Sequence, residues 1–312
     1  MTDQALSNSL AGPPDNAPPG PSLTGPPPAG AGHLERPARV LLGWLPPERG
    51  EFILVANQAG VELTDQQRAR VRQARAAVAA RLIGVDQTDL VSALPPELAG
   101  HLARLQPTPA GARMFQEGWD VAMVDLERVI AFQPLVFTDT AVERVADVAP
   151  DDLEAIAELT LPIDHTAPVI AQYEELKQTY TFTSPDPNLK VLGIYNGPVP
   201  EANGAHGFGF LVGVAPSFLQ VARFQDRHVL RDGYHRTFGL LSRGISSVPA
   251  FIRDFDTLEN LAPAGMLPQS AWLGQRPPLL SDYHNDLVSE SVRWPAQRKM
   301  VIVQALELSP QG

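Results

Sequence analysis

The sequence contains no cysteine. This absence excludes disulfides, thiolate metal sites and thiol nucleophiles, and it fits a reducing compartment. No uninterrupted apolar run approaches the roughly 20 residues that a membrane-spanning helix needs. The first residues also lack the cationic and apolar regions of a secretory signal peptide. We therefore expect a soluble, cytoplasmic protein with no membrane partner.

Basic residues are in the minority. The chain has 24 Lys and Arg against 35 Asp and Glu, which gives a formal net charge of −11. This balance disfavours non-specific binding to DNA, RNA or anionic membranes, because those partners are held through surfaces rich in Lys and Arg. DNA binding is disfavoured rather than excluded, since a local basic pocket remains compatible with an acidic chain.

Proline and glycine divide the chain into segments. Residues 1–34 are dominated by Pro, Gly, Ala and Ser, so they can bury little apolar area and we expect a disordered tail. Residues 35–110 are expected to form a small extension made of a hairpin and helices. Residues 115–255 interleave strand-like and helix-like patterns, and residues 256–312 are rich in loops until a final strand. The sequence therefore predicts an α+β (mixed α/β) protein.

Local signals place the main elements. Thr64 can cap a helix, Gln67 stands three residues on as in a capping box, and Gly84 follows its end. The runs "RVLLGWL" and "EFILVAN" around "PPERG" predict a hairpin. Strands are predicted at residues 121–124 and within "KVLGIYN", "GFGFLVGV", "FLQVARF" and "KMVIVQALEL". Helices are predicted at residues 151–159 and 167–180.

A basic cluster stands out in the acidic chain. Residues 219–253 carry six arginines and two aspartates, a local charge of 6 − 2 = +4: Arg223, Arg227, Arg231, Arg236, Arg243 and Arg253 against Asp226 and Asp232. The segment "VLRDGYHRTFGLL" changes from a strand pattern to a helix pattern at Gly233. A helix N-terminus exposes unpaired N–H groups and partial positive charge, and glycine permits close approach of the backbone. We therefore expect an anion site at Gly233, with His235 and Arg236 as donors and Asp232 orienting them.

The segment "VLRDGYHRTFGLLSRGISSVPAFI" resembles the strand–Gly-x-His-Arg–helix–strand core of the ParB/sulfiredoxin superfamily, in its Asp-Gly-x-His-Arg variant. "VAMVDLERVIAFQP" resembles the first box of that family and lies about 100 residues upstream, which implies an insertion over residues 140–205. The resemblance covers roughly residues 115–255. Where the family has glycine and arginine around bound nucleotide phosphates, this chain has Gly233 and Arg236.

The resemblance implies a nucleotide ligand (ATP, ADP or CTP), possible Mg²⁺, and phosphate hydrolysis or transfer. Arg231 and Gln133 join the expected binding residues. Tyr234 occupies the place of the sulfiredoxin cysteine, so sulfiredoxin chemistry is excluded. A catalytic base would be an acid near the first box. Asp125 and Glu127 are preferred there, and Asp139 and Glu143 are also available.

Other interpretations remain open. The cluster at Gly233 is also compatible with a structural turn whose arginine pairs with a local acid. Asp282, His284 and Asp286 form a possible but weak metal-ligand pattern. At the level of function, the alternatives to an enzyme are a non-catalytic regulator that binds a nucleotide or nucleic acid, and an interaction protein whose pocket has lost its function.

Overall fold

The computed structural model describes residues 35–55, 62–165, 167–186, 188–199, 205–261, 266–296 and 299–304. These residues form helices and several sheets, which confirms the predicted mixed α+β class. The predicted disordered tail, residues 1–34, lies outside the described residues. In the part of the chain that is described, no helix is long and apolar enough to cross a membrane.

A five-stranded sheet lies at the centre of the hydrophobic core. Its strand order is β10-β9-β11-β3-β2. Its strands, in chain order, are β2 (Val91–Ser92), β3 (Asp120–Asp125), β9 (Gln220–Phe224), β10 (Arg227–Asp232) and β11 (Ser247–Asp254). β9 pairs antiparallel with β10 and parallel with β11, and β11 pairs antiparallel with β3. The strands predicted at 121–124, in "FLQVARF" and in "VPAFI" are therefore confirmed.

Helix α7 (Tyr234–Ser242) connects β10 to β11 and begins at the turn that the sequence singles out. It packs against α5 (Thr138–Arg144). The approach is close at Gly239, because a Cβ there would collide with the carbonyl oxygen of Ala141. The position of α7 is consequently fixed by its close packing against α5.

A second sheet has the order β12-β1-β4. It brings together β1 (Glu35–Val40), β4 (Leu135–Phe137) and β12 (Glu290–Pro295) from distant parts of the sequence. The hairpin predicted within residues 35–110 is wrong, because β1 pairs with β12 and β4, and "PERGEFIL" forms helix α1 (Pro47–Leu54). Pro47 occupies the first position of that helix, where its missing N–H costs nothing, so "PPERG" starts a helix instead of turning a hairpin.

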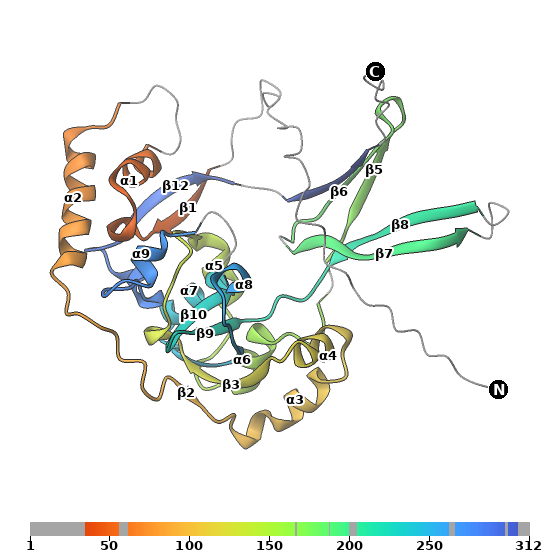
Figure 1. The fold of residues 1–312 in the computed structure, drawn as a ribbon, viewed down its shortest axis with the longest axis horizontal. Helices are drawn as coiled ribbons and strands as arrows, with labels where there is room; N and C mark the ends of the chain where they lie inside the picture. Colours follow the sequence, from red (N-terminus) through yellow and green to blue (C-terminus); the bar gives the residue numbers. More distant parts are fainter. Residues whose placement is uncertain are drawn as a thin grey trace. The chain divides into compact units, whose positions relative to one another are not determined.

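The remaining helices surround these sheets, and α1 and α2 lie beside β1 and β12 (Figure 1). The α-helices are α2 (Asp65–Ala79), α3 (Ala99–Leu105), α4 (Pro109–Gln116), α6 (Leu153–Thr160), α8 (Leu258–Leu261) and α9 (Gln269–Trp272). Short 3₁₀ turns occur at η1 (Leu42–Trp44), η2 (Pro96–Leu98), η3 (Leu126–Arg128), η4 (Glu175–Lys177) and η6 (Leu280–His284). The capping box of α2 is confirmed, with the Thr64 hydroxyl accepting from the Gln67 amide.

Between α6 and β9 the chain forms strands that do not join the central sheet, and β13 from the C-terminal part pairs with one of them. One sheet has the order β13-β6-β5, and a ribbon pairs β7 with β8. These strands are β5 (Ile170–Glu174), β6 (Thr179–Thr183), β7 (Leu189–Val199), β8 (Ala205–Val214) and β13 (Met300–Gln304). The helix predicted at 167–180 is wrong. The Thr and aromatic residues there favour strands, and Tyr173 packs directly across from Tyr180 in the ladder.

Candidate functional site

The turn between β10 and α7 has the geometry that a glycine permits. Gly233 has φ +108° and ψ 14°, in the left-handed region. A Cβ at this position would lie 3.2 Å from Cγ of Leu219, so a larger residue would meet both backbone strain and crowding. Among the described residues, no side chain caps the first turn of α7. The first backbone N–H groups of the helix have no intrahelical acceptors, so they require another partner.

Tyr234 joins the two sequence motifs. Its buried hydroxyl donates to the carbonyl of Leu230 (2.6 Å) and accepts from the amide of Phe132 (3.0 Å). Burial raises the pKa of this phenol, so the hydroxyl stays protonated as a donor. A bridge between Ile130 and Val229 adds a backbone link. The segments at 121–134 and 229–236, which are about 100 residues apart in sequence, therefore meet at one place.

Arg236 is almost completely buried, with 6% of its surface exposed. Its guanidinium donates to the carbonyls of Ser217 and Leu159 and to the hydroxyl of Ser217. Desolvation lowers the pKa of Arg236 to about 10, and the charge of Asp232 partly opposes that shift. The Ser217 hydroxyl donates in turn to Asp232 (3.1 Å). Arg236 and Asp232 are thus linked through Ser217, and most of the arginine's donors are engaged by protein oxygens.

His235 lies in a cationic environment. Its ring stacks on Phe137, with centroids 6.0 Å apart and planes 10° from parallel. Desolvation, together with the charges of Arg144, Arg36 and Arg236, lowers the pKa of His235 to about 4 against a smaller opposing effect of Asp139. The imidazole is therefore neutral at pH 7 and can both donate and accept one hydrogen bond.

Among the three arginines around His235, Arg144 differs from the other two. Arg36 is held by Asp139, with Nη2 2.6 Å from Oδ1, and Arg236 is held as described. Arg144, the last residue of α5, is exposed and has no hydrogen bond or ion pair with any described residue. Sequence reasoning missed it because the charge count covered residues 219–253, and only the packing of α5 against α7 brings Arg144 to this place.

Arg231 points to a different place from the turn. Its guanidinium lies 5.6 Å from the ring of Trp119 and 5.3 Å from that of Phe255, and it donates to Gln220. Arg253 faces the same two rings. Desolvation and the charge of Arg253 lower the pKa of Arg231. The structure therefore separates Arg231 from the group formed by Gly233, His235 and Arg236.

Asp125 and Glu127 lie toward the opposite end of the sheet. Asp125 pairs with Ser247, the first residue of β11. Asp232, next to the turn, pairs with Gln220, and Gln220 in turn pairs with Phe251 of β11. Four residues of strand separate these levels, which is about 13 Å. Asp125 also accepts from Arg128 (2.8 Å) and from the amide of Glu127. The structure does not bring the preferred catalytic acids to the turn.

Gln133 approaches the turn only through its backbone. Its amide lies 3.4 Å from the Tyr234 hydroxyl, and its carbonyl accepts from Tyr283. The Gln133 side chain donates to the carbonyl of Leu135. Gln133 therefore helps to position the loop above Tyr234, while its side-chain amide is engaged locally.

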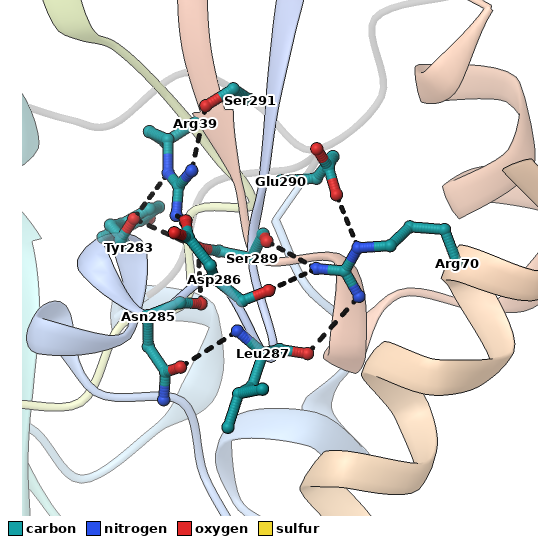
Figure 2. Close-up of polar contacts among 9 residues, drawn as sticks. All are labelled: Arg39, Arg70, Tyr283, Asn285, Asp286, Leu287, Ser289, Glu290 and Ser291. Atoms are coloured by element: carbon teal, nitrogen blue, oxygen red, sulfur yellow. Dashed lines mark hydrogen bonds and ion pairs between the residues drawn. The ribbon is translucent and has the colours of Figure 1, made fainter.

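The residues of the weak metal pattern have separate partners. Asp282 pairs with Arg81, and His284 stacks on Phe238. Asp286 accepts from Arg39 at the cluster drawn in Figure 2, where Arg39 and Arg70 hold the segment from Tyr283 to Ser291. No group of three or more His, Asp or Glu residues that could hold a metal ion occurs within the described ranges.

A cleft of about 690 Å³ adjoins the cluster of Figure 2, between α2 and β12. Its charged walls are already paired. Arg70 donates to Glu290 (2.6 Å) and to three backbone carbonyls, and Arg293 pairs with Glu35. Because these charges neutralise one another, the cleft offers a ligand less unsatisfied charge than the turn at Gly233 does.

No family model, no curated protein and no solved structure matches the chain. The case for a function therefore depends on the chemistry of the turn itself.

Proposed function

We propose that the chain is a ParB/sulfiredoxin-like protein that binds a nucleotide through a phosphate at the N-terminus of α7. Two features support the resemblance. The strand, the left-handed Gly233, the helix and the following strand occur in the order that the motif implies. The Tyr234 hydroxyl also links the two boxes by hydrogen bonds to Leu230 and Phe132.

The observation that carries the proposal is the exposed charge of Arg144 beside His235 and Arg236. An exposed cation without a described partner stands near enough to His235 and Arg236 to lower the pKa of both. The location also has an uncapped helix N-terminus and a neutral imidazole. A bound anion would compensate the mutual repulsion of the arginines and accept from the first amides of α7, which is the usual chemistry of phosphate at a helix N-terminus.

In this proposal the residues have distinct roles. Gly233 permits the left-handed turn from which α7 starts, Arg144 supplies the exposed cation and His235 donates one hydrogen bond. Arg236 acts as a positioning residue, because its contacts with Ser217 and Leu159 hold the start of α7 against the neighbouring loop. The nucleotide would be ATP, ADP or CTP, with or without Mg²⁺.

A second candidate function is nucleotide binding without turnover. The location of Asp125 and Glu127 favours it, because a catalytic base about 13 Å away along the sheet would not reach the phosphate. Of the acids nearer the turn, Asp139 is engaged by Arg36 and Asp232 by Ser217, whereas Glu143 on α5 is exposed. In this case the protein would be a nucleotide-responsive regulator.

Thermal unfolding in the presence of ATP, ADP or CTP, each with and without Mg²⁺, tests both candidates. A ligand bound only by the native state raises the melting temperature by mass action. If no nucleotide stabilises the protein at millimolar concentration, both proposals are wrong. If one does, release of phosphate from that nucleotide distinguishes the enzyme from the regulator.

A further inference from the structure

Among the described residues, the ribbon of β7 and β8 lacks the support that such a structure needs. Each strand pairs only with the other among the described strands, and together they form a long two-stranded ribbon (Figure 1). A two-stranded hairpin alone is marginally stable in water, and stability requires at least a third strand or a covered face. The ribbon therefore has the properties of an incomplete sheet.

One face of the ribbon is apolar and exposed. The register places Phe210 opposite Ile194 and Phe208 opposite Asn196, so these side chains share a face. Phe208 is 68% exposed, Ile194 67% and Phe210 50%. On the other face β8 carries Gly207, Gly209 and Gly213 with Leu211. Aromatic residues thus alternate with glycine along β8, and nothing described covers them.

The two outer edges of the ribbon differ. β7 carries Lys190 and Pro198 and has an irregular register between Val191 and Gly193, and each of these features obstructs the addition of another strand. β7 also lies beside β13. β8 contains no Lys, Arg, Asp, Glu or Pro and no register shift. The edge of β8 is therefore open to another strand.

We propose that β8 pairs with β8 of a second copy of this chain, antiparallel and centred on Gly209, to form a four-stranded sheet across a two-fold axis. The sequence of β8 favours a second copy because it is nearly palindromic, with Gly-Phe-Gly-Phe-Leu at residues 207–211. Centring on Gly209 sets Phe208 opposite Phe210 of the second copy, and Phe210 opposite its Phe208. Cross-strand aromatic pairs of this kind stabilise antiparallel sheets.

The opposite face fits the same register. Leu211 stands opposite Gly207 of the second copy, so a large side chain meets a small one, and Gly209 meets Gly209. No like charges face each other. The contact is isologous, since each copy offers the same strand, and it closes after two copies instead of growing into a fibre.

The proposed contact is small. Each copy contributes one strand edge and a few large apolar side chains, which is less than the roughly 800 Å² per partner of a standard stable interface. We therefore expect a reversible dimer with a dissociation constant on the order of micromolar. This inference is independent of the proposed nucleotide site.

Sedimentation velocity of the full chain across a concentration series tests the inference with two matched double variants. F208K/F210K sets lysine opposite lysine in the proposed register, whereas F208K/F210E sets lysine opposite glutamate at both pairs. We expect the wild type to dimerise, F208K/F210K to dimerise at least about tenfold more weakly than F208K/F210E, and Ile194→Lys on β7 to dimerise as the wild type does. Far-UV circular dichroism checks that each variant is folded.

Four results would overturn the inference. A wild type that stays monomeric at high concentration would exclude the dimer. Two double variants that both dimerise like the wild type would place the contact elsewhere. If F208K/F210K and F208K/F210E are equally monomeric, the register centred on Gly209 is excluded. Protection from hydrogen exchange, in a monomer, of the β8 amides that do not pair with β7 would assign the edge to a segment of the same chain.

Discussion

Arg144 and His235 come from different helices, and the charge of the arginine lowers the pKa of the imidazole. The two residues are 91 positions apart in the sequence, and the packing of α5 on α7 brings them together. Arg36 and Arg236 share this location, but protein oxygens already engage both of them. The free charge of Arg144 is consequently the feature that distinguishes an anion site from a structural turn.

His235 predicts a specific dependence of stability on pH. Its pKa in the folded protein is about 4, below the ordinary value of 6.5. As the pH falls, His235 therefore binds a proton in the unfolded chain before it does so in the folded protein. The resulting loss of stability begins as the pH falls below 6.5 and is complete near pH 4. Between pH 7 and 5 this one residue should remove about 2 kcal/mol.

Urea denaturation at pH 7 and pH 5, for the wild type and His235→Gln, measures that contribution. The difference between the two proteins isolates His235, because His228 and His284, whose pKa values are also lowered, stay in both. Parallel pH profiles would contradict the buried, neutral imidazole.

Arg236→Ala should destabilise the protein whether or not a ligand is present. Removing the guanidinium leaves the carbonyls of Ser217 and Leu159 without their donor in a buried place. We expect a loss of roughly 2–4 kcal/mol in the free energy of unfolding. Arg236→Lys should recover little of it, because one ammonium cannot reproduce the planar fork of donors. An alanine variant as stable as the wild type would contradict the positioning role.

Gly233→Ala should be costly for two separable reasons. The left-handed φ strains any other L-residue, and the new Cβ would crowd Leu219. Gly244→Ala supplies the matched control, since Gly244 also has a positive φ (+75°) but nothing lies within 4 Å of its added Cβ. We expect about 1 kcal/mol for Gly244→Ala and roughly 2–3 kcal/mol for Gly233→Ala. Equal losses in urea denaturation would show that crowding at Gly233 is unimportant.

Tyr234→Phe tests the link between the two motifs. The variant keeps the ring but removes the hydroxyl that serves Leu230 and Phe132, so we expect a loss of about 1–3 kcal/mol. Tyr173→Phe is the control, because its ring is exposed and its hydroxyl has no hydrogen bond among the described residues. Similar unfolding free energies for the two variants would contradict a stabilising role for the Tyr234 hydroxyl.

Local signals in the sequence predicted local structure well. The Thr64 capping box, the strand at 121–124 and the strand–Gly233–helix succession all depend on neighbouring residues, and all are confirmed. The hairpin expected in 39–57 failed because the partner of β1 is β12, about 250 residues away. No local pattern specifies such a pairing.

The candidate site was only partly predictable for the same reason. Gly233 and His235 belong to one motif, so their proximity follows from the chain itself. Arg144 lies at the site because two helices pack together. Arg231 lies outside it, since a register irregularity precedes Asp232 and the Arg231 guanidinium faces the ring of Trp119. The direction of side chains and the contacts between distant elements were not accessible from sequence patterns.

Ligand-induced thermal shifts of Arg144→Ala and Arg243→Ala test the central claim most directly. Both arginines are exposed and without described partners, and Arg243 follows the opposite end of α7, so the two variants change the net charge equally. With the nucleotide that stabilises the wild type, the account predicts that Arg144→Ala loses most of the shift and Arg243→Ala keeps it. Equal shifts in the two variants would contradict an anion site at the N-terminus of α7.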